Sequence, residues 1–292
     1  MEYFDRAGEV EITGVIDFDL VKTFECGQCF RWDADENGIY TGVAYGRAAR
    51  LRRVDSSVFI SGSLTDFETM WRDYFDLDRD YGEIQRKLCI DDYMREVISF
   101  GAGIRILRQD SWEALCSFII SQCNNIPRIK KIVAAVCREF GERLDFEGAQ
   151  LYTFPTAEKL ASLSTEDLAP LRCGYRAEYI LSAARAVAEK TPDLEALSRG
   201  TPEQARHALK TLHGVGNKVA DCVLLFGLNM LDAFPLDVWM KRAVAERYGR
   251  GFDPGIFSPY AGLAQQYIFY HARSMKNENL GKPSKKSLQS PR

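Results

Sequence analysis

The sequence predicts an α+β fold, in which an N-terminal domain with an antiparallel sheet is followed by a mostly α-helical domain. From residue 23 to about residue 63, short strand-forming runs alternate with turn sequences. Beyond residue 65 the apolar residues recur at helical spacing. A chain of 292 residues with 46% hydrophobic content is long enough for two compact units. We therefore predict a sheet domain over 1–98, a helical domain over 99–275 and a disordered tail over 276–292.

The first domain is expected to contain a row of short strands, because strand-forming runs are separated by turn sequences. These strands are expected over 30–32, 39–44, 49–53 and 58–61. The segments Asp-Glu-Asn-Gly, Tyr-Gly and Asp-Ser-Ser supply the turns between them. Successive strands joined by such short turns pair in the antiparallel sense.

The second domain is expected to consist of helices whose ends carry recognisable signals. Asp110 and Glu113 have the spacing of a capping box before an apolar run. A helix is expected over 127–140, where a proline in the first turn precedes apolar residues at helical spacing. Another is expected after 173–176, and two more on either side of 213–217. The final residues are rich in Lys, Ser, Pro and Asn, a composition that does not support a packed core.

The composition argues against secretion and membrane insertion. The chain starts with acidic residues and no apolar run, and no later stretch reaches the roughly 18 uninterrupted apolar residues of a membrane span. The eight cysteines are scattered through apolar surroundings, as free thiols are in a reducing compartment. We therefore expect free thiols and a location in a reducing compartment.

Metal binding and bulk electrostatic binding of DNA are both disfavoured. Cys26 and Cys29 form a Cys-x-x-Cys pair, but a zinc site or cluster needs a second pair and none follows at useful spacing. The net charge of −3 means that any contact with nucleic acid must be made by local groups.

The most informative segment is Leu-His-Gly-Val-Gly-Asn-Lys-Val-Ala-Asp-Cys at 212–222. Gly214 and Gly216 permit a tight turn, and the helix that follows presents unpaired N–H groups and the positive end of its dipole, which suits a phosphate. Such a hairpin can bind DNA without basic side chains. On its own, the Gly-x-Gly pattern could equally join two packed helices.

The full pattern resembles the helix-hairpin-helix of the DNA glycosylase superfamily, and Pro-Leu-Asp-Val follows at 235–238. The resemblance implies that Lys218 and Asp237 meet at the target sugar. A neutral amine can capture C1′ and form a Schiff base, while a carboxylate stabilises positive charge on the sugar. The alternative for Asp237 is a helix N-cap, which is compatible with the catalytic role, and for Lys218 a solvated helix residue.

Within that superfamily the chain resembles the 8-oxoguanine DNA glycosylases, from about residue 23 to residue 273. The resemblance is carried by 26–32, 103–110, 118–128, 174–177 and 261–269. It implies that the carbonyl of Gly27 accepts the N7 hydrogen that distinguishes 8-oxoguanine from guanine. Guanine would leave this buried carbonyl without a hydrogen bond, at a cost of about 1 to 3 kcal/mol. It also places Cys222 and Phe269 on the two faces of the flipped base and Gln265 at its edge. Without the family context, Gly27 would be a turn glycine, Cys222 and Phe269 would be core residues, and Gln265 would be a surface residue.

The resemblance further implies a group of residues at the opposite cytosine and along the DNA. They are Cys123, Asn124, Asn125, Arg128, Tyr175 and Arg176, with His213, Gly214, Val215 and Gly216 in the hairpin. Taken alone, the loop residues read as capping and solvated groups. Cys123 departs from the family pattern, which has an asparagine there. The resemblance also allows a monovalent cation on hairpin carbonyls.

We therefore predict a base-excision repair enzyme that flips 8-oxoguanine out of double-stranded DNA and removes it through a Schiff base on Lys218. A β-elimination lyase step follows, and no redox cofactor is implied. For such an enzyme we expect a monomer that is cytoplasmic and associated with the nucleoid, or nuclear. The alternatives are a glycosylase of the same superfamily for another lesion, such as an alkylated base, and a catalytically silent DNA-binding or scaffold module. Pure binding requires neither Lys218 nor Asp237, so this pair favours an enzyme.

Overall fold

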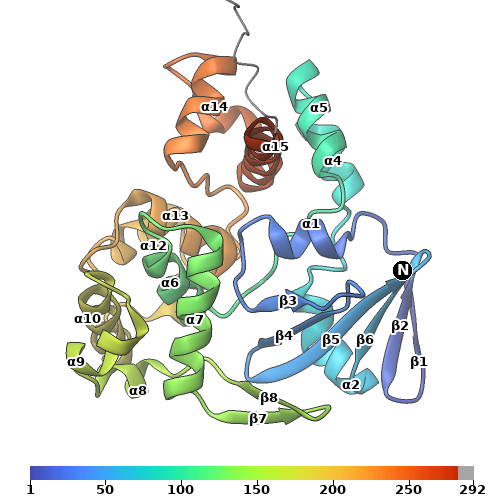
Figure 1. Cartoon of the computed structure of the whole chain (residues 1–292). Coiled ribbons are helices and arrows are strands. Elements are labelled where there is room, and N and C mark those ends of the chain that lie inside the picture. Colours follow the sequence, from blue (N-terminus) through green and yellow to red (C-terminus); the bar gives the residue numbers. More distant parts are fainter. Residues whose placement is uncertain (282–292) are drawn as a thin grey trace, which may run out of the picture.

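The computed structural model describes residues 1–281 and has the predicted α+β architecture, with a six-stranded sheet beside a larger helical part (Figure 1). The strands pair antiparallel in the order β1-β2-β6-β5-β4-β3. They are β1 Glu2–Asp5, β2 Glu9–Thr13, β3 Trp32–Ala34, β4 Tyr40–Ala44, β5 Arg47–Val54 and β6 Ser57–Ser61. The four predicted strands correspond to β3 to β6.

Two strands of the six-stranded sheet were not predicted. β1 and β2 precede the region from which the sheet was expected to start, yet β2 alternates strictly, with Val10 and Ile12 buried and glutamates between them. β2 pairs with β6 and β1 covers the outer edge of β2. The alternation of polar and apolar residues in β2 could therefore have predicted this strand from the sequence.

The core of the sheet domain is aromatic. Phe24, in α1 (Leu20–Glu25), stacks on Trp32 with ring centroids 4.7 Å apart. Trp71 and Phe75 stack on each other with ring centroids 5.8 Å apart, and both rings contact Trp32 at steeper angles. They come from the short helices that follow β6, which are α2 Leu64–Asp66, the π-helix η1 Phe67–Trp71 and α3 Arg72–Tyr74.

Twelve further α-helices make up the rest of the described chain. They are α4 Tyr81–Leu88, α5 Asp92–Gly101, α6 Ser111–Ile120, α7 Ile126–Phe140, α8 Ala157–Ala161, α9 Thr165–Leu168, α10 Arg176–Ala188, α11 Leu194–Ser198, α12 Pro202–Leu209, α13 Asn217–Phe226, α14 Val238–Tyr248 and α15 Ala261–Gly281, with the 3-10 helices η2 Ala169–Leu171 and η3 Pro254–Phe257. A two-stranded hairpin, β7 Arg143–Phe146 and β8 Ala149–Tyr152, interrupts them. The prediction of helix throughout this region was wrong at that hairpin.

The two hydrophobic cores do not divide the chain at residue 98. Apolar residues of α4 and α5, such as Ile84 and Val97, belong to the helical core, and α5 packs on α15. The sheet core instead takes in Leu107, from the segment that follows α5. The chain therefore passes from the sheet core to the helical core at α4, returns to the sheet core at Leu107 and then continues in the helical core. Because the two cores alternate along this segment, no single residue separates them, and the boundary at residue 98 stays a prediction.

The expected capping box at the start of α6 forms only in part. Asp110 caps the helix by accepting a hydrogen bond from the N–H of Glu113 at 2.8 Å. The Glu113 carboxylate instead pairs with Arg31 at 3.1 Å, and Arg31 also donates to the carbonyl of Tyr152. Burial raises the pKa of Glu113, and the positive charge of Arg31 opposes that shift. The pair joins the sheet domain to α6 and β8.

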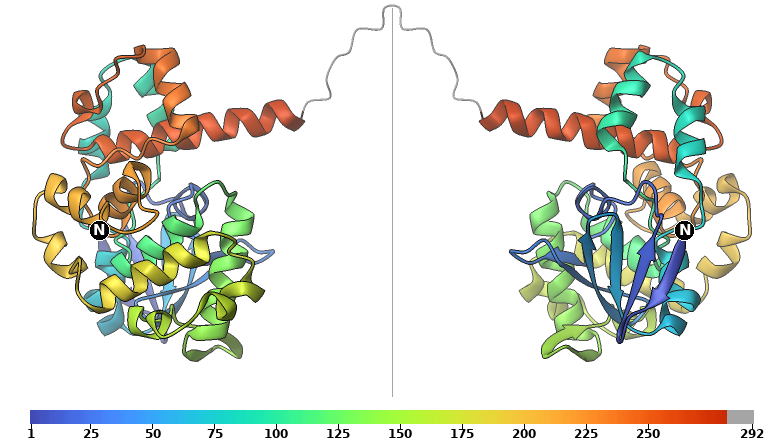
Figure 2. Two further views of the ribbon diagram at one scale, coloured as in Figure 1. Left: turned by 90° about the vertical axis from the view of Figure 1, so that its left-hand side faces the viewer. Right: turned by 90° about the vertical axis from the view of Figure 1, so that its right-hand side faces the viewer.

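The end of the described chain is helical. α15 continues to Gly281 and projects beyond the rest of the protein (Figure 2). Residues 276–281 are therefore helical where a disordered tail was expected, and the remainder of that predicted tail, 282–292, lies outside the described residues.

All eight cysteines are free thiols, as expected. Across residues 1–281 no group of His, Cys, Asp and Glu side chains could hold a metal ion. None of the helices described has the length and apolar character needed to cross a membrane.

Candidate active site

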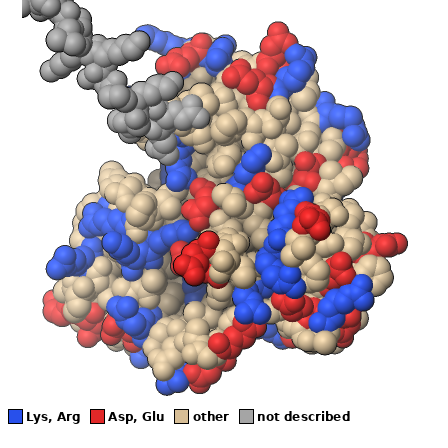
Figure 3. All heavy atoms as spheres, turned by 45° about the vertical axis from the view of Figure 1, so that its right-hand side comes forward, with Lys and Arg blue, Asp and Glu red and all other residues tan. Residues whose placement is uncertain are grey.

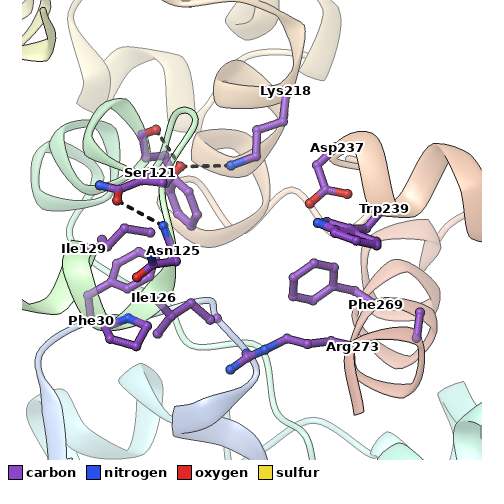
Figure 4. Close-up of a pocket in the computed structure, with 15 residues that line it drawn as sticks. Phe30, Ser121, Asn125, Ile126, Ile129, Lys218, Asp237, Trp239, Phe269 and Arg273 are labelled. Carbon is purple, nitrogen blue, oxygen red and sulfur yellow. Dashed lines mark hydrogen bonds between the residues drawn. The ribbon is translucent and has the colours of Figure 1, made fainter. Parts of the chain in front are cut away.

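A cavity of about 510 Å³ lies where the segment after α1, the α6–α7 connection, α13 and the α14–α15 pair meet (Figure 4). This volume is in the range of sites for small ligands. The cavity is lined by Gly27, Phe30, Phe118, Ser121, Asn124, Asn125, Ile126, Pro127, Ile129, Lys218, Asp237, Trp239, Phe269, Ala272 and Arg273. The predicted nucleophile, its carboxylate partner and two predicted base-binding residues therefore line one cavity.

Lys218 is half-buried near the start of α13, and its side chain points into the cavity. Its Nζ donates a hydrogen bond to Oγ of Ser121 at 3.0 Å, and Ser121 in turn donates to the carbonyl of Phe118. The same Nζ lies 5.2 Å from the centroid of the Phe118 ring. The C-terminal end of α6 thus positions the amine, which excludes the alternative of a fully solvated helix residue.

Asp237 is the N-cap of α14 and also lines the cavity. Its carboxylate accepts a hydrogen bond from the N–H of Met240 at 2.7 Å. A carboxylate has two oxygens and several acceptor positions, so this bond leaves capacity for another partner. The capping role is present, and it fixes the side chain at the wall of the cavity that Lys218 also lines.

Two predicted base-binding residues are buried behind the cavity wall and do not line the cavity. Cys222 follows Lys218 by one turn of α13 and is 3% exposed. Burial raises the pKa of its thiol to about 11, while the charge of Lys218 acts in the opposite direction. Gln265 is 4% exposed, and its Oε1 is buried without a hydrogen-bond partner among the described residues. An unpaired buried amide oxygen is costly, so Gln265 has acceptor capacity to offer a ligand.

Gly27 lines the cavity because its neighbour Gln28 is locked in place. The fully buried Gln28 amide donates to the carbonyls of Thr23 and Arg105 and accepts from the N–H of Leu107. Gly27 has a φ of +88°, and a Cβ there would lie 3.1 Å from Ile126 and 3.5 Å from Phe269. Both the backbone conformation and the space therefore favour glycine at this position.

The residues predicted at the opposite base gather around the α6–α7 loop, but most of them bind the protein itself. Arg176 is 4% exposed, with Nε donating to the carbonyl of Gln122 at 2.8 Å and Nη1 to that of Cys173 at 3.2 Å. Its Nη2 donates to the carbonyl of Cys123 at 3.2 Å. Cys123 is exposed with a φ of +48°, and burial together with this thiol raises the pKa of Tyr175. Arg176 therefore holds the loop against α10.

The loop asparagines have capping roles in addition to lining the cavity. Asn125 Oδ1 accepts from the N–H of Arg128 at 3.0 Å and so caps α7. Asn124 Nδ2 donates to the carbonyl of Ile120 at 3.1 Å, which ties the loop to α6. The Arg128 side chain is exposed and donates to the carbonyl of Arg172 at 3.3 Å. The capping role, which was the alternative to a role at the opposite base, is thus present for Asn125.

The hairpin between α12 and α13 has the predicted geometry. Gly214 has a φ of +81°, and a Cβ there would lie 2.3 Å from the ring of Tyr179, which packs on the turn. His213 packs edge-on against the same ring at 4.8 Å, and Val215 is buried. Gly216 is the N-cap of α13 with open space around it, and no side chain caps the helix. The first amides of α13 are therefore available to an anion.

Nine of the fifteen lining residues were not predicted as site residues, among them Phe30, Phe118, Ser121, Trp239 and Arg273. Phe30, Phe118 and Ser121 lie within family-like segments, but nothing in the pattern marks them individually. Trp239 is 46% exposed in the first turn of α14, and the guanidinium of Arg242 lies 5.6 Å from its ring. An exposed tryptophan directly after Asp-Val was a signal that could have been used.

The surface charge agrees with local contacts to DNA. On the face in Figure 3, basic and acidic side chains are intermixed, and a group of basic side chains borders a hollow at the left of the view. β5 carries four arginines, and acidic neighbours pair three of them, Arg47, Arg50 and Arg52. No broad field of one sign is formed on this face.

The helix-hairpin-helix, the adjacent lysine and the aspartate at the next helix define a base-excision DNA glycosylase. Residues 116–252 match the model of the HhH-GPD superfamily of base excision DNA repair proteins. Residues 12–115 match the model described as 8-oxoguanine DNA glycosylase, N-terminal domain.

Known proteins are similar to this chain along most of its length. The N-glycosylase/DNA lyase of Saccharomyces cerevisiae is 34% identical over 255 residues, which cover 78% of this chain and 68% of the yeast protein. The structure of MBOgg1 in complex with a low-affinity DNA ligand is 44% identical, with a TM-score of 0.90, and covers 94% of this chain and 100% of that chain. The Clostridium acetobutylicum 8-oxoguanine glycosylase/lyase, in complex with double-stranded DNA containing cytosine opposite 8-oxoguanine, is 35% identical with a TM-score of 0.90 and covers 94% and 99%.

The chain belongs to the 8-oxoguanine DNA glycosylase family of bifunctional N-glycosylase/DNA lyases, and its function is base excision repair. This confirms the predicted fold class, family and enzyme class. It decides against the alternatives of an alkylated-base glycosylase and of a silent binding module.

Proposed function

We propose that this protein removes 8-oxoguanine from double-stranded DNA with Lys218 as the nucleophile and Asp237 as the electrostatic partner. The observation that carries the proposal is that both side chains line one cavity with Gly27 and Phe269. The cavity has room for a base outside the helix stack, and enzymes that act on a base in a duplex must extrude it. Because the proposed substrate is DNA, we propose that the protein acts in the nucleoid or the nucleus, and we retain the prediction of a monomer.

The reaction starts when the neutral Nζ of Lys218 attacks C1′ of the flipped nucleotide. The C1′–N9 bond breaks, and its electron pair leaves with the base. Positive charge builds on the sugar during this step, and the carboxylate of Asp237 stabilises it. The base takes a proton from the C1′-bound nitrogen. The C1′–O4′ bond of the sugar then breaks as the lone pair of this nitrogen forms the Schiff base, and O4′ takes a proton from water. Loss of a proton from C2′ then eliminates the 3′ phosphate, which is the lyase step.

Recognition of the lesion is assigned to the end of the cavity near α15. The carbonyl of Gly27 accepts the N7 hydrogen of 8-oxoguanine, a hydrogen that guanine lacks. Cys222 and Phe269 face the two sides of the ring, and Gln265 offers its unpaired oxygen to the base edge. For Cys222 and Gln265 this contact requires a movement of the side chains around them, because both residues are buried.

Binding of the duplex is assigned to the hairpin and to the α6–α7 loop. A phosphate would accept hydrogen bonds from the uncapped amides at the start of α13, next to His213, Gly214 and Val215. The opposite cytosine would meet Arg128 and Tyr175, and it would meet Arg176 after a movement of that side chain, which is buried and bonded to loop carbonyls. The loop residues Cys123, Asn124 and Asn125 would fill the space left by the flipped base. A monovalent cation on the hairpin carbonyls stays a prediction.

Borohydride trapping on an 8-oxoguanine duplex tests the assignment of Lys218. We expect the wild type to form a covalent complex and Lys218→Gln to form none, while binding to the duplex persists because the hairpin amides are intact. Lys159→Gln, which alters an exposed lysine of α8, is the matched control and should trap like the wild type. Trapping of Lys218→Gln at the wild-type level would show that another residue is the nucleophile.

A further inference from the structure

Arg273 is a cavity residue to which the proposed function gives no role. It lies on the face of α15 that also carries Gln265 and Phe269, because residues four and eight positions apart share one side of a helix. Its guanidinium lies at the end of the cavity away from Lys218 and Asp237 (Figure 4). An arginine is always charged. α15 therefore brings a permanent positive charge to the base end of the cavity.

The guanidinium is fixed beside Gly27. Nη1 of Arg273 donates a hydrogen bond to the carbonyl of Glu25 at 2.8 Å. The same nitrogen would lie 3.9 Å from a Cβ placed on Gly27, whose other close neighbours include Phe269 at 3.5 Å. A guanidinium has five N–H donors in a rigid fork. The bond to Glu25 uses one of them, and a base held between Gly27 and Phe269 would lie within reach of the others.

8-Oxoguanine offers acceptors at this place. When the carbonyl of Gly27 accepts the N7 hydrogen, the base oxygens O6 and O8 lie on either side of that contact. Breaking the C1′–N9 bond leaves the electron pair on the base, and the resulting anion spreads its charge onto O8. A nearby cation favours the charged form, and a charged donor strengthens the hydrogen bond.

We propose that Arg273 is a catalytic residue that binds the carbonyl edge of 8-oxoguanine and stabilises the negative charge of the departing base. The proposal rests on the assignment of Gly27, Phe269 and Lys218 made above. C1′ exchanges its bond to N9 for a bond to Nζ of Lys218, and both electrons of the broken bond go to the base. The base then takes the proton released by that nitrogen. Arg273 transfers no proton and acts through its charge and its hydrogen bonds.

Substitutions of Arg273 separate this role from a structural one, in which the side chain only holds the carbonyl of Glu25. Arg273→Gln keeps a polar donor and loses the charge, whereas Arg273→Lys keeps the charge and loses the fork. Arg138→Gln removes an exposed charge of α7 away from the cavity and is the matched control. Two reactions are compared under single-turnover conditions: excision of 8-oxoguanine, and β-elimination at a preformed abasic site, where there is no base to leave.

We expect Arg273→Gln to slow excision by about 10²-fold, as does the loss of one preorganised electrostatic donor elsewhere, and to change elimination by less than about twofold. Arg273→Lys should retain about tenfold more excision activity than Arg273→Gln, because the charge remains. Equal slowing of both reactions by both variants would show a structural role and overturn the proposal. Unchanged excision in Arg273→Gln would overturn it as well.

A second measurement reads the charge directly. Free 8-oxoguanine is used as an inhibitor of excision over a range of pH, and its ionisation makes it an anion at the higher values. Inhibition should strengthen with ionisation in the wild type and in Arg138→Gln, and it should not do so in Arg273→Gln. The same pH dependence in all three proteins would overturn the proposal. If Lys218→Gln still traps, the proposed function itself fails, whereas failure at Arg273 alone leaves the dependence on Lys218 intact.

Discussion

Replacing Asp237 by asparagine separates the two roles of this side chain at the cavity. As the N-cap of α14 it accepts the Met240 N–H at 2.7 Å, and asparagine caps a helix about as well as aspartate. Asp237→Asn should therefore change the free energy of unfolding by less than about 0.5 kcal/mol. Asp237→Ala removes the acceptor and should cost about 1 kcal/mol, which lowers the Tm by roughly 2 to 4 °C for a domain of this size.

The loss of activity should not follow the loss of stability. Both variants lack the carboxylate, so both should lose about 10² to 10³-fold in the single-turnover excision rate. The assay is excision of 8-oxoguanine at a temperature well below the Tm of either variant, beside thermal unfolding. Asp193→Asn is the control, because Asp193 caps α11 in the same way and does not line the cavity. Wild-type excision by Asp237→Asn, with a loss only in Asp237→Ala, would refute an electrostatic role and leave only the cap.

Three further changes test other parts of the site. Cys123→Asn should steepen the dependence of excision on the opposite base, measured with C, T, G and A, because an amide is a stronger hydrogen-bonding group than a thiol; an unchanged ranking would place Cys123 away from that base. Phe269→Ala should weaken binding to 8-oxoguanine DNA far more than binding to abasic DNA, and equal losses would assign Phe269 to the general core. Gly214→Ala should weaken binding to undamaged duplex by at least about tenfold, since loss of the close turn displaces the hairpin amides. The control is Gly148→Ala, since Gly148 has the same φ of +81° with open space around it, and binding should be unchanged. Weaker binding by Gly148→Ala would show that backbone strain alone explains the effect.

The sequence predicted the proposed catalytic residues more fully than the residues that surround them in the cavity. Lys218 and Asp237 lie within short patterns whose chemistry demands those residue types, and the structure brings them to one cavity. The partners that orient them come from distant elements. Ser121 positions the amine from the end of α6, and no local pattern predicts a contact across 97 positions.

The fold was predictable where periodicity is strong and not where packing decides. The helical spacing located α7 and α10, and the alternating runs located β4 to β6. The hairpin of β7 and β8 was missed because each strand has only four residues and none of their positions is buried, so the alternation in β7 is too short to mark a strand. Glu113 was expected to complete a capping box, but the buried Arg31 offers a charged partner that local sequence could not reveal.

The placement of α4 and α5 has a consequence for how the chain is made. Both helices are synthesised early, directly after the sheet domain, yet α5 packs on α15, which is among the last segments to leave the ribosome. The sheet can close as soon as Leu107 has emerged, since its core requires nothing later. The apolar faces of α4 and α5 must wait for the other end of the chain. During synthesis these two helices therefore form an exposed apolar surface of the kind that chaperones bind.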